Sequence, residues 1–148
     1  MPNPAEDATH TFPYAQPVLN VISCTYIGKV FGGGYGERAV LYGNPMVNIN
    51  MIAGLWASEL GAADKLGEVV DVFGGGNAAK VEGNTTVNIG TEAKVKLTSI
   101  VDNSSTTDVD ESQPTVKGAN ITGNVYGGGN LADVTGNTNV NICAKYNT

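Results

Sequence analysis

An internal repeat constrains this chain more than any other feature. Residues 72–90 are VFGGGNAAKVEGNTTVNIG and residues 125–143 are VYGGGNLADVTGNTNVNIC, and the two segments align without a gap. A looser copy, VFGGGYGERAVLYGNPMVNIN, spans residues 30–50, with two extra residues between its glycine triplet and Gly43. Repetition on this scale is typical of folds built from stacked structural units.

Each copy predicts three short strands separated by two sharp turns. The first strand ends in Val-Phe or Val-Tyr, directly before three glycines that can enter backbone regions closed to other residues. An alternating segment such as Ala79-Lys80-Val81 follows, then a Gly-Asn turn and a final Val-Asn-Ile strand. The run at 18–22 resembles such a final strand from a truncated preceding unit.

Strands this short cannot bury a face within one unit, so successive units must stack. We therefore expect an all-β fold, a parallel β-helix (β-solenoid) of about three to four coils with two long inserts. The alternative is a β-sandwich or open antiparallel sheet in which each repeat is a hairpin meander.

Stacking predicts columns of equivalent side chains. Phe31, Phe73 and Tyr126 each precede a glycine triplet, and we expect them to form an inward-facing aromatic column. The turn asparagines should stack and share amide hydrogen bonds. The other predicted columns are aliphatic; the full set beyond the aromatics is Val47, Val87 and Val140; Ile49, Ile89 and Ile142; Asn44, Asn84 and Asn137.

The segments around the repeats define the domain organisation. Residues 1–17 contain four prolines and are expected to form an extended N-terminal arm, while residues 18–148 form a single β-solenoid domain. The repeats leave two inserts, 51–71 and 91–124. Trp56 lies in the first insert, where it is either a packing residue or an aromatic on a binding surface.

Composition and charge exclude several functions. The chain has 8 Lys and Arg against 14 Asp and Glu, a net charge of -6, which is opposite to what a nucleic-acid surface requires. A single His excludes most His-based catalysis and multi-His metal sites. No apolar run is long enough for membrane insertion.

No residue set predicts catalysis, a cofactor or a resident metal. The glycine triplets lack the Lys-Ser/Thr of a phosphate-binding loop, which favours turns. We expect the acidic residues to form a solvated surface. The alternative is opportunistic calcium binding at Asp108, Asp110 and Glu111. Cys24 and Cys143 have no metal-binding spacing, and we expect separate free thiols about three coils apart.

The GGGN…V.GNT.VNI pattern of the three copies resembles the Gly/Asn-rich β-solenoid repeats of large secreted or surface proteins of Bacteroidetes-type gut bacteria. It is more weakly similar to the repeats of bacterial adhesins and autotransporter passengers. The resemblance implies a non-enzymatic structural or adhesive module at the cell surface or secreted. It does not supply a ligand, and our own expectation for the partner is a glycan or a host-surface protein. The alternative is a carbohydrate-binding or carbohydrate-active β-helix domain.

The two ends of the chain carry their own expectations. Residues 1–17 do not have the basic and apolar segments of a signal peptide, so we expect a fragment of a longer exported protein. The last copy is followed by no recognisable polar cap, and an uncapped strand edge is a template for another chain. We therefore expect the repeat array to continue, or the chain to self-associate end to end.

Overall fold

The computed structural model describes residues 15–51, 66–90 and 118–142, which contain strands, turns and loops but no helix. None of the described residues therefore supplies a helix that could cross a membrane. The strands within these ranges are β1 (Val18–Val21), β2 (Tyr26–Phe31), β3 (Leu41–Tyr42), β4 (Met46–Ile49), β5 (Glu68–Phe73), β6 (Val81–Glu82), β7 (Thr85–Ile89), β8 (Val125–Tyr126) and β9 (Thr138–Ile142).

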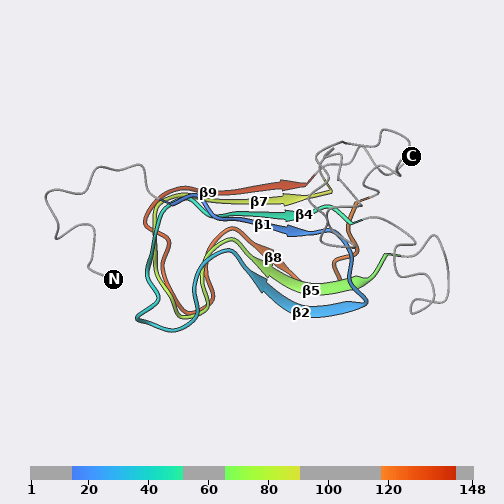
Figure 1. Ribbon diagram of the computed structural model, residues 1–148, viewed down its shortest axis with the longest axis horizontal. Helices are drawn as coiled ribbons and strands as arrows, with labels where there is room; N and C mark the ends of the chain where they lie inside the picture. The colour runs from blue at the N-terminus through green and yellow to red at the C-terminus, as the bar shows by residue number, and fades with distance from the viewer. Residues whose placement is uncertain (1–14, 52–65, 91–117, 143–148) are drawn as a thin grey trace, which may run out of the picture.

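These strands pair in three parallel sheets. The four-strand sheet has the order β1-β4-β7-β9, the three-strand sheet β2-β5-β8 and the two-strand sheet β3-β6 (Figure 1). Every ladder between these strands is parallel, and equivalent residues of the repeats pair with one another, as in Val47 with Val87. The prediction of an all-β fold with parallel strands is confirmed, and the antiparallel alternative is wrong.

Each repeat supplies one layer, which we define as the set of strands that one repeat contributes to the sheets. The first layer is β2, β3 and β4, and the second is β5, β6 and β7. In the third, β8 and β9 flank Val134, which bridges Val81 without forming a strand. β1 pairs with β4 on the side away from β7, so the run at 18–22 does add a strand from a partial preceding unit.

The apolar core lies between the four-strand and three-strand sheets. Val47, Ile49 and Val87 from one sheet and Val69 and Val72 from the other have essentially no exposed surface. β-Branched side chains suit this position because they pack well on a pleated surface. Full burial of each contributes about 1.5–3 kcal/mol.

The glycine triplets allow neighbouring layers to approach closely. A Cβ on Gly75 would lie 2.8 Å from the Gly129 nitrogen and 2.9 Å from its Cα, both backbone atoms of the next layer. No side chain fits in that space, so the triplet is required where one layer is covered by another. Gly128 occupies the equivalent position in the last layer, and a Cβ there would meet nothing within 4 Å.

The borders of the predicted arm and inserts shift slightly. The carbonyls of Ala15 and Pro17 accept hydrogen bonds from Asn44 and Met46, so the end of the predicted arm already belongs to the stack. Proline has no N–H to donate, but its carbonyl still accepts. β5 begins at Glu68, inside the predicted insert 51–71.

The second insert rejoins the stack before its predicted end. The Asn120 carbonyl accepts from the Val69 N–H at 3.0 Å, and Ile121 bridges Val69 in parallel.

The first fourteen residues and segments 52–65, 91–117 and 143–148 lie outside the described residues. Five predictions fall there, those on most of the N-terminal arm, on Trp56, on Cys143, on the acidic group at 108–111 and on most of both inserts.

Candidate functional site

The three aromatic residues stack in one column. The rings of Phe31 and Phe73 have centroids 4.9 Å apart and planes 12° from parallel, and those of Phe73 and Tyr126 are 4.8 Å and 15° apart. This spacing is the distance between neighbouring strands, so the column follows directly from the register of β2, β5 and β8. Phe73 is 7% exposed because its neighbours cover both ring faces, whereas the terminal Tyr126 is 45% exposed.

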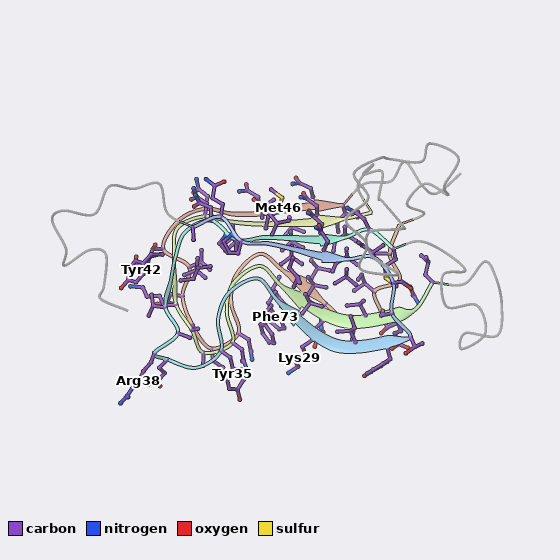
Figure 2. The ribbon with its side chains drawn as sticks, in the orientation of Figure 1. Lys29, Tyr35, Arg38, Tyr42, Met46 and Phe73 are labelled. Atoms are coloured by element: carbon purple, nitrogen blue, oxygen red, sulfur yellow. The ribbon has the colours of Figure 1, made fainter. Side chains whose placement is uncertain are left out.

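The aromatic column does not face the core, contrary to the inward orientation expected from the sequence. Val72 belongs to the apolar cluster between the sheets and Phe73 does not. Figure 2 shows Phe73 on the side of the three-strand sheet that faces away from the four-strand sheet. The column therefore lies outside the space between the two sheets, where Phe73 is covered and the terminal Tyr126 is open to solvent.

The predicted aliphatic columns lie in the four-strand sheet and are structural. In the first column Val47 pairs with Val87 and Val87 with Val140. The second column pairs Ile49, Ile89 and Ile142 in the same order. The columns begin one strand earlier than predicted, because Leu19 pairs with Val47 and Val21 with Ile49.

The turn asparagines stack through a different bond from the one expected. The Asn84 backbone N–H donates to the Asn44 Oδ1 at 2.8 Å, and the Asn137 N–H donates to the Asn84 Oδ1 at 2.8 Å. The bond joins main chain to side chain rather than amide to amide. Each asparagine therefore fixes the Gly-Asn turn of the following layer.

A second asparagine column, which was not among the predicted columns, carries the amide-to-amide bonds. It runs along the outer face of the four-strand sheet through Asn20, Asn48, Asn88 and Asn141; we call it the outer asparagine column. Each side-chain nitrogen donates to the Oδ1 of the preceding layer, at 2.9, 2.8 and 2.9 Å. Asn130 donates to Asn77 in the same sense at 2.8 Å. The signal was present, since an asparagine stands between two aliphatic residues in every Val-Asn-Ile strand.

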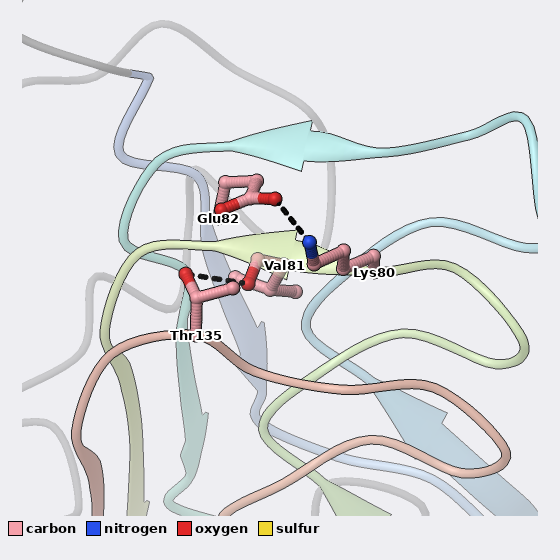
Figure 3. A network of polar contacts seen from close by, with 4 residues as sticks. All are labelled: Lys80, Val81, Glu82 and Thr135. Atoms are coloured by element: carbon pink, nitrogen blue, oxygen red, sulfur yellow. Dashed lines mark hydrogen bonds and ion pairs between the residues drawn. The ribbon is translucent and has the colours of Figure 1, made fainter.

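One ion pair lies on the surface of the two-strand sheet. Lys80 contacts Glu82, two residues along on the same face of the chain, beside a hydrogen bond from Thr135 to the Val81 carbonyl (Figure 3). The hydrogen bond with Glu82 raises the pKa of the Lys80 ammonium, and the same bond lowers the pKa of the Glu82 carboxyl. Both groups are open to solvent, so this is a screened surface pair.

Cys24 is a half-buried free thiol that donates to the Glu68 carbonyl at 3.7 Å. Burial raises its pKa, which disfavours the nucleophilic thiolate. In the part of the chain that the structure describes, no three His, Cys, Asp or Glu side chains gather where they could hold a metal ion.

Comparison with known proteins returned no match to a family model, to a curated protein or to a solved structure.

Proposed function

We propose that this chain is a non-enzymatic structural and adhesive module with a parallel β-solenoid architecture, belonging to a secreted or surface-exposed bacterial protein. The observation that carries the proposal is the layered register: three repeats place equivalent residues above one another in two parallel sheets, and the first two repeats do so in a third sheet. Successive repeats that stack in this way support a solenoid.

The side chains support a scaffold rather than an enzyme. Repeated positions are used for packing and for layer-to-layer hydrogen bonds, as in the buried Val87 and the Asn88 amide. The likeness of the repeats to surface proteins of gut bacteria supports the location. Such a scaffold holds its inserts at fixed positions, and these inserts would contact a glycan or a host-surface protein.

An array of mucin glycans and matrix proteins tests the adhesive part. We expect the 148-residue chain to bind at least one class, and a variant with residues 91–117 scrambled to lose that binding. A second variant, Tyr35→Ser, alters an exposed aromatic of the stack and should bind as the original chain does.

Two results would contradict this function. Release of reducing ends from a polysaccharide by the chain would identify a carbohydrate-active domain instead. Absence of binding to every array class would remove the adhesive role.

A further inference from the structure

The last strand of the four-strand sheet leaves an open edge. Val140 is 40% and Ile142 is 70% exposed, although their counterparts in β7 are buried in the core. Within the described residues, β9 pairs with β7 only. Its outer edge is thus an apolar and hydrogen-bonding surface of the kind that recruits another strand.

The register of the ladder identifies the residues of β9 whose N–H groups point away from the sheet. The Met46 N–H donates to Pro17 and the Thr86 N–H to Pro45, both toward the preceding layer. The Thr85 N–H donates to Asn137 in the next layer, because alternate residues of a central strand donate to opposite neighbours. By register, the N–H of Val140 points away from β7.

The first strand presents the complementary edge. Val18 pairs with Met46, so by the same alternation its N–H points away from β4. Leu19, which is 40% exposed, is the first member of the aliphatic column whose last member is Val140. Strand β1 therefore offers what β9 lacks, a parallel neighbour in which an asparagine likewise stands between two aliphatic residues, as Leu-Asn-Val in β1 and Val-Asn-Ile in β9.

The outer asparagine column gives the two edges opposite polarity. Every bond in it runs from a later layer to an earlier one. Among the described residues, Asn20 accepts through Oδ1 with its amide nitrogen unused, and Asn141 donates to Asn88 with its Oδ1 unused. A donor end and an acceptor end are complementary only when the two are brought together.

We propose that β9 of one chain pairs in parallel with β1 of a second copy of the same chain. This contact sets Leu19 on Val140 and Val21 on Ile142, and it lets the Asn20 amide donate to Asn141. It goes beyond the scaffold role, which a monomer also fills. The contact is head to tail, so it builds open chains rather than closed pairs.

Two proline variants test the direction of this contact. Val140→Pro blocks the outer edge of β9 and Val18→Pro blocks that of β1; each removes an N–H that no described residue uses, and proline is tolerated on edge strands. Light scattering should show the average mass of the unaltered chain rising above 15.2 kDa with concentration. Each variant alone should stay at 15.2 kDa, since one of its two edges is blocked.

An equimolar mixture of the two variants is the decisive sample. Each supplies the edge that the other lacks, so the mixture should form a closed pair of about twice the monomer mass. A pairing of β9 with β9 would instead leave Val18→Pro dimeric by itself.

Three results overturn the proposal: a monomeric unaltered chain at its highest soluble concentration, a single variant that still associates, or a mixture that stays monomeric. Circular dichroism verifies folding, and Val18→Lys with Ile142→Lys replaces the proline pair where a proline unfolds its edge. Tyr35→Ser is the control and should associate as the unaltered chain does. None of these results touches the array test of adhesion.

Discussion

Gly33, Gly75 and Gly128 occupy one position in three successive layers, but the space around them differs. The first two face the backbone of the layer above at 2.8 Å, whereas the third faces open space. Packing therefore requires glycine at this position in the first two layers, whereas no described contact requires it in the third.

Alanine at these glycines should separate the two situations. We expect Gly75→Ala to lower the free energy of unfolding by about 3 kcal/mol, because its methyl group meets main chain that cannot move aside. Gly128→Ala should be neutral or stabilising by up to about 1 kcal/mol, since it only restricts the unfolded chain. Urea denaturation of both variants gives the comparison, and equal losses would show that the layers do not approach as described.

The Lys80–Glu82 pair has a defined pH window. The lowered pKa of Glu82 means that its contribution is complete above the usual carboxyl range and is lost as pH falls through the lowered value. The raised pKa of Lys80 means that its contribution is complete below the usual lysine range and is lost as pH rises through the raised value. The pair acts between these limits.

Glu82→Gln should therefore lower the pKa of Lys80 toward its ordinary range. Nuclear magnetic resonance titration of the Lys80 side chain measures this directly. Glu37→Gln, in an exposed turn, is the matched control and should leave the Lys80 pKa where it is. An unchanged value in Glu82→Gln would mean that the ion pair does not form in solution.

At the scale of elements, the members of the aromatic column differ in how much of each ring is covered by its neighbours. The middle member of the aromatic column is covered on both ring faces, while Tyr126 has one neighbour. Phe73→Ala should cost about 3 kcal/mol of unfolding free energy, the low end for a buried aromatic, because the column faces outward. Tyr126→Ala should cost less than half as much. Thermal and urea unfolding measure both losses, and a larger loss for Tyr126→Ala than for Phe73→Ala would contradict the described coverage of the rings.

The outer asparagine column predicts a graded response to aspartate. Within one chain Asn20 only accepts, so Asn20→Asp should be nearly neutral for unfolding at a concentration where the chain is monomeric. Asn88 both donates to Asn48 and accepts from Asn141, so Asn88→Asp should cost about 1–3 kcal/mol at neutral pH by facing a carboxylate to an acceptor.

The loss in Asn88→Asp should shrink as the new carboxyl is protonated. A protonated oxygen donates to Asn48 again, so the folded-state pKa is raised and stability relative to the unaltered chain returns as pH falls through it. Unfolding at neutral and acidic pH, with Asn20→Asp as control, gives the measurement. A loss that is independent of pH would contradict the donor direction assigned to this column.

For the whole molecule, the layer order bears on the cysteines. Cys24 follows β1, and Ile142 at the end of β9 precedes Cys143, three strand spacings or about 14 Å along the stack. A disulfide needs Cα atoms within about 7 Å. We expect two alkylatable thiols by mass spectrometry of the denatured, unreduced chain, and an intramolecular bridge would overturn this order.

Much of this fold could be predicted from the sequence because the repeat fixes its own register. Once Val87 and Val140 are aligned, parallel stacking determines which residues meet. The facing of Val72 and Phe73 could not be decided in the same way. Alternation says only that neighbours point apart, and both are apolar; the structure includes Val72 in the core cluster and leaves Phe73 out of it.

The asparagine bonds show the same limit. Recurrence identifies an asparagine as a member of a column, but the choice between a main-chain and a side-chain donor depends on backbone direction at that point. At Asn84 the turn offers its own N–H, whereas at Asn88 the main-chain groups are already used by the sheet. Local geometry therefore decides what composition leaves open.

Both inserts are tethered at one place on the stack. The first leaves after Met51 and the second returns at Gly118, and the Met51 N–H donates to the Gly118 carbonyl at 2.6 Å. Segments that begin at these two residues start close together, so the effective concentration of one relative to the other is in the millimolar range or above. Two weak binding segments grafted there would therefore act on one ligand together, with an avidity that neither reaches alone.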